Sequence, residues 1–198
     1  MYRWRKISPE KRRETLAERR LLKRPWHSPR HHSDGKGSFL ITSTCFEHMP
    51  TIGISDHRMD SFSKELCGVV SDHSERVDAW AVLPNHYHVL VVTASCGALL
   101  KALGRLHGRT SRQWNREENL VGRKVWFNTM DRRIETDAHH VTALQYVLHN
   151  PVKHGHVRKW DVWKWSSARD YIGRIGREEA ERRWREHPLL NFGQGWDD

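Results

Sequence analysis

The chain alternates between segments whose apolar residues follow a strand pattern and segments whose apolar residues follow a helical pattern. Runs rich in β-branched and aromatic residues, such as FLITSTCF and HYHVLVVT, predict strands, whereas apolar residues that recur every three or four positions predict amphipathic helices. The predicted strands are 38–46, 76–84, 86–93 and a short one at 130–134. The predicted helices are 58–73, 97–117 and a third that begins at Thr136 or Asp137 and ends near His149, before Pro151.

The order of these elements is strand, helix, strand, strand, helix, strand, helix. Such an order predicts an α+β fold, in which a small antiparallel sheet carries helices packed on one face. Pro84 and Asn85 separate the second strand from the third, so we expect these two strands to form an antiparallel hairpin across a tight turn.

Segments at both ends of the chain are expected to lie outside the folded domain. Residues 1–37 are expected to form a basic N-terminal extension, in which a helix at 8–23 is capped by Ser8 and is followed by a linker rich in Pro, Gly, Ser and His. The folded domain is expected at 38–172, and residues 173–198 are expected to form a C-terminal helical tail.

The excess positive charge lies mostly in the first part of the chain. The formal net charge is +10 and the pI is about 9.9, and residues 1–30 hold eleven Lys or Arg but three Glu. A cationic protein of this size tends to bind a polyanion, most often nucleic acid, although a solvated basic tail would give the same composition.

Cysteine usage and hydropathy predict a protein of the reducing cell interior. Cys45, Cys67 and Cys96 form no C-x-x-C pair, which argues against a disulfide framework and against a zinc ribbon. The sequence has no apolar run of about 18 residues and no signal-peptide core. We therefore expect a cytoplasmic, nucleoid-associated protein with no membrane partner.

Two histidines lie two residues apart in the most strand-like part of the chain, the segment L-P-N-H-Y-H-V-L-V at 83–91. Residues i and i+2 of a strand point to the same face, so His86 and His88 can present ring nitrogens to one divalent ion, while Tyr87 faces the core on the opposite side. An H-x-H pair alone is weak evidence, because the chain holds 15 histidines.

Tyr146 and Asn150 form a second candidate pair. They lie one helical turn apart in the segment A-L-Q-Y-V-L-H-N-P-V-K, so both face the same side of a helix. A Tyr phenolate can attack phosphorus, and an Asn oxygen can complete the coordination shell of a metal ion. The same residues also suit a core aromatic and a helix stop before proline, so the pair alone does not decide between the two interpretations.

Several separated motifs, in one order, resemble a known family. They are L-P-N-H-x-H-h-L-h from Leu83 (h, hydrophobic), W-x-x-x-x-x-R-R-I from Trp126, Y-h-x-x-N-P-V-K-x-G-x-V from Tyr146 and W-x-W-S-S-A-R-D-Y-I-G from Trp163. This combination resembles the REP-associated tyrosine transposases, relatives of insertion-sequence transposases within the HUH endonuclease superfamily. The resemblance covers roughly residues 38–172.

The resemblance implies a ferredoxin-like or RRM-like core with four or five antiparallel strands. It matches His86 and His88 to the metal-binding histidines of the family, Tyr146 to its catalytic nucleophile and Asn150 to a third metal ligand. The implied cofactor is Mg²⁺ or Mn²⁺. The implied reaction is the cleavage and rejoining of single-stranded DNA beside palindromic, REP-type hairpins through a covalent 5′-phosphotyrosine, carried out by a monomer or a homodimer.

Basic residues near these motifs are candidate contacts to the DNA backbone, because Lys and Arg supply most of the electrostatic affinity for nucleic acid. The candidates are Arg105, Arg109, Arg112, Arg132, Arg133, Lys153 and Arg158. Each of them would also suit a solvated surface.

Two alternative functions stay open from the sequence. A metal-dependent phosphoesterase would use the H-x-H pair to activate water, would need additional Asp or Glu ligands and would not need Tyr146. A domesticated hairpin-DNA-binding protein would keep the fold and bind DNA without cleaving it. The joint presence of His86, His88 and Tyr146 argues mildly against this second alternative.

Overall fold

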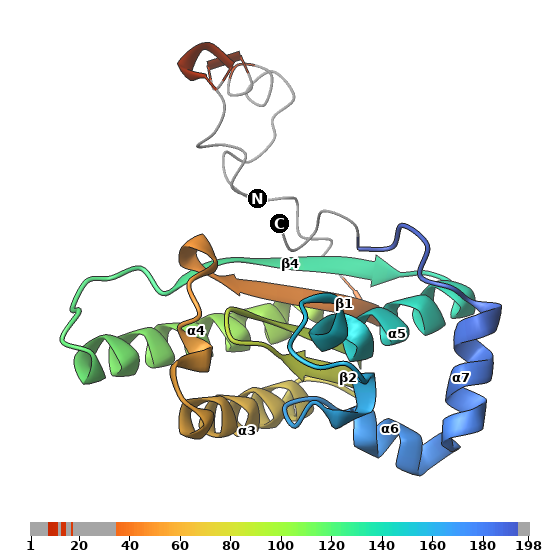
Figure 1. Ribbon diagram of the computed structural model, residues 1–198. Helices are drawn as coiled ribbons and strands as arrows, with labels where there is room; N and C mark the ends of the chain where they lie inside the picture. The colour runs from red at the N-terminus through yellow and green to blue at the C-terminus, as the bar shows by residue number, and fades with distance from the viewer. Residues whose placement is uncertain (1–7, 12, 15–16, 18–34, 194–198) are drawn as a thin grey trace.

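The centre of the computed structural model, which describes residues 8–11, 13–14, 17 and 35–193, is a four-stranded antiparallel sheet (Figure 1). Its strands are β1 (Gly37–Cys45), β2 (Arg76–Val82), β3 (His86–Thr93) and β4 (Trp126–Ile134). The strands are ordered β2-β3-β1-β4 across the sheet, and each neighbouring pair is antiparallel.

Helices connect and cover these strands. The α-helices are α3 (Asp56–Asp72), α4 (Cys96–Glu117), α5 (Asp137–Lys153), α6 (Ala168–Ile175) and α7 (Arg177–Glu186), and the short 3-10 turns are η1 (Phe46–His48), η2 (Ile52–Ile54) and η3 (Trp160–Val162). Ser55, Ser95 and Thr136 cap α3, α4 and α5, because each side-chain oxygen accepts a backbone N–H of the first turn. Among the described residues, no helix has the length and hydropathy needed to cross a membrane.

The chain order β1-α3-β2-β3-α4-β4, combined with this strand order, is a ferredoxin-like arrangement. This arrangement confirms the predicted α+β class. The sheet was expected to have four or five antiparallel strands, and it has four. The predicted hairpin between β2 and β3 is also confirmed, and the N–H of Leu83 donates to the carbonyl oxygen of His86 at 2.8 Å across its turn.

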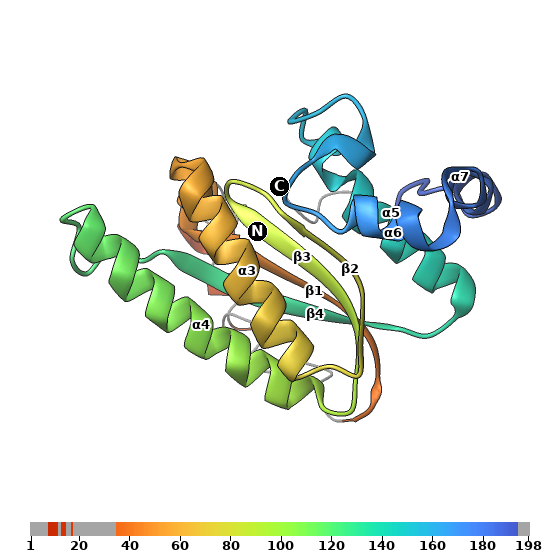
Figure 2. The same ribbon diagram turned by 90° about the horizontal axis from the view of Figure 1, so that it is seen from below.

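Helices cover both faces of the sheet, so the prediction that they pack on one face is wrong (Figure 2). Phe39 and Ile41 of β1 pack with α3 and α4, whereas Leu40 of β1 and Leu90 of β3 pack with α5, α6 and α7. The reason lies in β1 and β3. Consecutive residues of a strand point to opposite faces, and in these two strands the residues of both faces are buried. Apolar side chains on two faces need two covering layers to be removed from water.

Two elements extend further than predicted. β4 begins at Trp126 rather than at residue 130, because it pairs with β1 along nearly the whole length of that strand although its own sequence is largely polar. α5 continues through Pro151 to Lys153. A proline in the last turn removes one backbone hydrogen bond, and that turn is still closed by the N–H of His154, which donates to the carbonyl oxygen of Asn150 at 3.1 Å.

The predicted boundary at residue 172 falls within α6, and α7 buries Ala180 and Trp184 in the same core as α5. At the other end, the hydroxyl of Ser8 accepts the N–H of Lys11 at 3.2 Å, as expected for a helix cap. Most of the helix predicted at 8–23 lies outside the described residues, as does most of the linker.

A buried arginine ties α3 to the end of α4. Arg58 is 8% exposed, and its guanidinium donates to Glu118 at 2.6 Å and to Glu117 at 2.8 Å. Arg123 donates to the second carboxylate oxygen of Glu118 at 2.7 Å. Hydrogen bonds from Arg123 and from Arg58 lower the pKa of Glu118 to about 2.

We expect Glu118→Gln to lower the free energy of unfolding by about 2 kcal/mol at pH 7, because Arg58 then stays buried with a weaker partner. Folding lowers the Glu118 pKa, so the contribution of this residue is complete above the ordinary value of 4.5 and is lost as the pH falls toward about 2. Urea unfolding of both proteins from pH 7 to pH 2 measures the effect. Glu178→Gln, which alters an exposed glutamate of α7, is the control. A stability difference that stays constant over this pH range would contradict the prediction.

Candidate active site

His86 and His88 lie side by side on the face of β3 that is turned toward α5. Their ring centroids are 5.0 Å apart, and the two residues are 1% and 0% exposed. Leu90, the next residue on the same face, packs in the core beneath α5. Tyr87 is buried on the opposite face, where its hydroxyl lies 3.0 Å from Nε2 of His107. The alternation predicted for this strand is therefore confirmed.

Polar neighbours orient both histidine rings. Thr42 of β1 stands opposite His88 in the ladder, and its hydroxyl lies 2.8 Å from Nδ1 of His88. The side-chain oxygen of Asn85 lies 2.7 Å from Nδ1 of His86. With Nδ1 of each ring engaged in this way, Nε2 is the nitrogen directed away from these partners. The sequence carried no signal for Thr42, because only the register between β1 and β3 makes it a neighbour of His88.

Asn150 joins the histidine pair from α5. Its side-chain oxygen lies 2.9 Å from Nε2 of His86, and the residue is 0% exposed. The spacing of one helical turn places it on the same side of α5 as Tyr146, as predicted. The structure therefore brings together all four residues that the two sequence motifs singled out.

Tyr146 packs directly against the histidine pair. Its ring centroid lies 5.1 Å from that of His88, with 71° between the ring planes. The ammonium group of Lys153 lies 5.1 Å from the centroid of the Tyr146 ring. Tyr146 is only 2% exposed, so its ring is shielded from water beside the ammonium group of Lys153.

The last described residues cover Tyr146. The Phe192 ring centroid lies 5.5 Å from the Tyr146 centroid, and Lys153 donates to the carbonyl oxygen of Gly193 at 3.2 Å. Gly193 has a φ of +77°, and any side chain at this position would collide with the Tyr146 ring. A cavity of about 400 Å³ remains between α5 and residues 189–192.

His154, which follows the last residue of α5, is an exposed neighbour of the histidine pair. Its ring centroid lies 4.9 Å from that of His86. Sequence reasoning did not single it out, because the stretch around α5 holds several histidines in equivalent contexts. His149 shows the contrast: it packs against Trp160 and Trp184 at 5.5 and 4.5 Å, and burial lowers its pKa.

The cations predicted to contact DNA divide between the two faces of the sheet. Arg132 of β4 stands opposite Leu40 and so faces α5, where burial lowers its pKa and the neighbouring Tyr146 acts in the opposite direction. Arg133 points to the other face, with its guanidinium 5.9 Å from the Phe39 ring centroid. Lys153 is exposed at the end of α5.

The remaining predicted cations are further from the histidine pair or point elsewhere. Arg105, Arg109 and Arg112 lie on α4, which covers the face of the sheet opposite to His86 and His88. Arg109 is paired with Glu65 of α3 at 2.8 Å. Arg158 is exposed in the loop between α5 and α6, two residues before Trp160, which packs in the core beneath α5.

Within the part of the chain that the structure describes, no three His, Cys, Asp or Glu side chains are grouped so as to hold a metal ion. A three-ligand site built on His86 and His88 would therefore have to use the Asn150 oxygen. The additional carboxylate ligands that a water-activating phosphoesterase would need are not grouped with the histidines in these residues.

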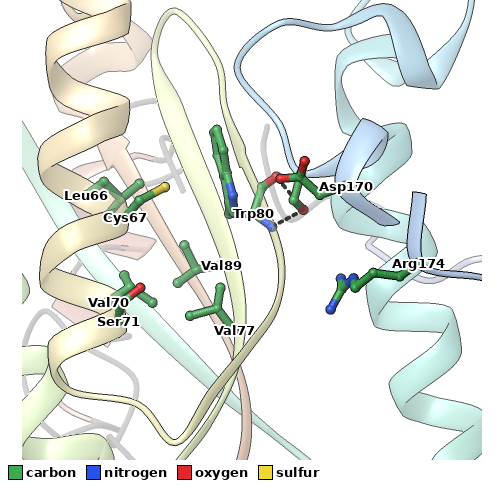
Figure 3. A pocket seen from close by; sticks show the side chains of 10 residues that line it. Leu66, Cys67, Val70, Ser71, Val77, Trp80, Val89, Asp170 and Arg174 are labelled. Atoms are coloured by element: carbon green, nitrogen blue, oxygen red, sulfur yellow. Dashed lines mark hydrogen bonds between the residues drawn. The ribbon is translucent and has the colours of Figure 1, made fainter. Parts of the chain in front are cut away.

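A separate cavity of about 310 Å³ lies at the outer edge of β2, between α3 and α6 (Figure 3). Leu66, Cys67 and Trp80 line it, and Asp170 and Arg174 border it from α6. Burial raises the pKa of the Cys67 thiol to about 11, so this thiol is not a ready nucleophile. Trp80 packs with the core beneath α3, so this cavity lies on the face away from the histidine pair.

Comparison with solved structures gives the fold a known counterpart. The chain matches a REP-associated tyrosine transposase, solved bound to a REP hairpin, with a TM-score of 0.58 and 18% sequence identity over 74% of this chain and 86% of that one. The fold is that of a REP-associated tyrosine transposase. The resemblance found in the motifs is thus confirmed in the fold.

A protein from Deinococcus radiodurans R1, described provisionally as a transposase, matches with a TM-score of 0.38 and 9% identity over 65% of this chain and 93% of that one. No protein-family model and no curated protein matches the chain.

We expect Gly193→Ala to raise the accessibility of Tyr146, because the added methyl group cannot occupy the space against its ring. Nitration by tetranitromethane, followed by peptide mass spectrometry, compares the rates at Tyr146, and the variant should react several-fold faster. Gly122→Ala is the matched control, since Gly122 also has a positive φ of +90° but no neighbouring atom in the described structure within 4 Å of an added side-chain carbon. Equal rates at Tyr146 in all three proteins would show that Gly193 does not hold the cover in place.

Proposed function

We propose that this chain is a metal-dependent tyrosine endonuclease and strand transferase, which cleaves and rejoins single-stranded DNA beside palindromic, REP-type hairpins. Two contacts carry the proposal. Tyr146 packs against His88, and Asn150 is hydrogen-bonded to His86 in the same site. The fold shared with a transposase that was solved bound to a REP hairpin supports the choice of substrate.

The proposed metal ion is Mg²⁺ or Mn²⁺, held by His86, His88 and Asn150. Nε2 of His86 and the Asn150 oxygen are 2.9 Å apart, so the two atoms are close enough to bind one ion together. Thr42 and Asn85 would be the outer partners that orient the two rings. When bound, the ion would polarise the scissile phosphate as a Lewis acid.

In the proposed reaction, the Tyr146 oxygen attacks the scissile phosphorus, and the bond from phosphorus to the 3′ oxygen breaks. The phenol gives up one proton and the departing 3′ oxygen takes up one. The products are a 5′-phosphotyrosine and a free 3′-OH. Because the phosphotyrosine retains the energy of the phosphodiester bond, a second 3′-OH can rejoin the strand without ATP.

The surroundings of Tyr146 suit this role. Lys153 lies over its ring, and Arg132 interacts with it electrostatically, so both cations favour the negative charge of a bound phosphate. Since Tyr146 is 2% exposed, residues 189–193 have to move before a DNA strand can reach it.

The proposal is tested by looking for the covalent adduct. With Mn²⁺ or Mg²⁺ and single-stranded oligonucleotides that contain palindromic hairpins, we expect the wild-type protein to form an adduct on denaturing gels. Tyr146→Phe should form none, because it lacks the nucleophile, and His86→Ala should reduce the adduct to background. Tyr171→Phe, which alters a buried tyrosine of α6, is the matched control and should react like the wild type.

Two results would overturn the proposal. Cleavage that persists in Tyr146→Phe would mean that water is the nucleophile. DNA binding without any adduct, across a broad set of hairpins, would mean that the chain binds hairpins without cleaving them.

The role of the outer partners can be measured without DNA. We expect Thr42→Val to weaken Mn²⁺ binding by about 10- to 100-fold in isothermal titration calorimetry, because His88 loses the partner of its Nδ1. Thr110→Val is the matched control, since Thr110 is also buried and its hydroxyl is also hydrogen-bonded, but it lies on α4, which covers the opposite face of the sheet. Equal Mn²⁺ affinity in the two variants would argue against His88 as a ligand that Thr42 orients.

A further inference from the structure

A row of aromatic side chains leads away from the candidate active site along the loop between α5 and α6. His154 begins the row against His86, with 4.9 Å between their ring centroids. Two residues further along the loop, the His156 ring stacks on Trp163 at 5.2 Å with 28° between the planes. Trp163 meets Trp165 edge to face at 5.0 Å, and both indole rings pack against the core beneath α3, so the row passes from the histidine pair around the end of β2. We call His154, His156, Trp163 and Trp165 the aromatic row.

The loop that carries the aromatic row is fixed to the end of β2. The N–H of Val82 donates to the carbonyl oxygen of Trp165 at 2.8 Å, and Nε1 of Trp163 donates to the carbonyl oxygen of Val82 at 2.9 Å. Nε1 of Trp165 donates to Asp60 of α3 at 2.8 Å. The two indole rings are therefore held in place before any ligand binds, which lowers the entropic cost of binding.

The aromatic row is accessible and lies in a basic segment. Its two histidines are exposed and its two tryptophans are half-buried. Residues 153–169 hold five Lys or Arg, all exposed, and one acidic residue, Asp161, which pairs with Arg177. The ammonium group of Lys164 lies 5.3 Å from the Trp165 ring centroid and also pairs with Asp60. Aromatic surface combined with excess positive charge is the composition that binds single-stranded nucleic acid.

We propose that the aromatic row binds the single-stranded DNA next to the scissile phosphate, with bases stacked on its rings and backbone phosphates near the basic side chains. The inference rests on the proposed function and adds the path of the substrate strand. The outer face of His156 and the exposed part of Trp165 are the stacking surfaces. A duplex cannot use them in this way, because its bases are already stacked on one another, so the aromatic row distinguishes single-stranded from paired DNA.

Fluorescence anisotropy in a Tyr146→Phe background, where no adduct is expected to form, tests this inference. The two probes are a blunt labelled hairpin and the same hairpin extended by a short single strand at both its 5′ and 3′ ends. We expect Trp165→Leu and His156→Ala each to weaken binding of the extended hairpin by about tenfold and to leave binding of the blunt hairpin unchanged. Trp165→Phe retains a ring and should retain most of the affinity.

The controls are His187→Ala on the C-terminal side of α7 and Lys101→Ala on α4, which is matched to Lys164→Ala. Lys164→Ala should weaken binding of the extended hairpin and lower the salt dependence of that binding, whereas Lys101→Ala should do neither. Thermal unfolding by circular dichroism verifies that each variant folds. If Trp165→Leu fails to fold, His156→Ala decides the outcome, because His156 is exposed.

Equal losses for both probes, or losses no larger than those of the controls, would overturn the inference. Tighter binding of an RNA extension than of a DNA extension would overturn the assignment to DNA. If the wild type forms no covalent adduct but the substitutions still weaken binding of the extended hairpin alone, the proposed cleavage fails while the aromatic row stands as a binding surface.

Discussion

The antiparallel pairing of β1 with β3 along the middle of the sheet is the constraint on which the rest of the structure depends. Neighbouring residues of β1 alternate between two buried faces: Phe39 packs beneath α3 and α4, and Leu40 packs beneath α5. In the same register Thr42 stands opposite His88 on the α5 face. A slip of β3 by one residue would turn both histidines toward α3 and α4. The apolar side chains of β3 that now pack beneath those helices would then face α5 instead. The packing of two cores therefore determines where the candidate active site lies.

α5 supplies the other half of this site, and the second core determines how the helix is rotated. Ala143, Leu144 and Val147 are buried against the sheet, which leaves Tyr146 and Asn150 facing the histidine pair. The four side chains are almost fully buried, so electrostatic interactions among them are stronger than in water. Burying polar groups is costly unless they are hydrogen-bonded, and Thr42 and Asn85 supply hydrogen bonds to the two imidazoles.

The surroundings of the site differ on its two sides. On the side of Tyr146, Phe192 and Gly193 lie against the ring, whereas on the side of His86 the exposed His154 borders the site. In the proposed reaction, the strand approaches along the loop between α5 and α6, where basic and aromatic side chains are concentrated, and Tyr146 becomes reactive once its cover has moved. Binding and attack are then separate events, because the binding surface is exposed while the nucleophile is not.

Local geometry explains what the sequence by itself determined. The spacing of apolar residues predicted the four strands of the sheet and the helices at 56–72, 96–117 and 137–153. The predicted ends of these elements differ from the observed ends by a few residues at most, and β3 was predicted with its observed bounds. The two-residue spacing of the histidines and the four-residue spacing of Tyr146 and Asn150 placed each pair on one face, because these spacings are properties of strands and helices themselves.

Tertiary structure alone decided the full length of β4, the contact of Thr42 with His88 and the cover that Gly193 places on Tyr146. Each of these joins residues that are distant in the sequence. Their meeting depends on strand register and helix docking, which follow from the packing of both cores as a whole and leave no local pattern to read.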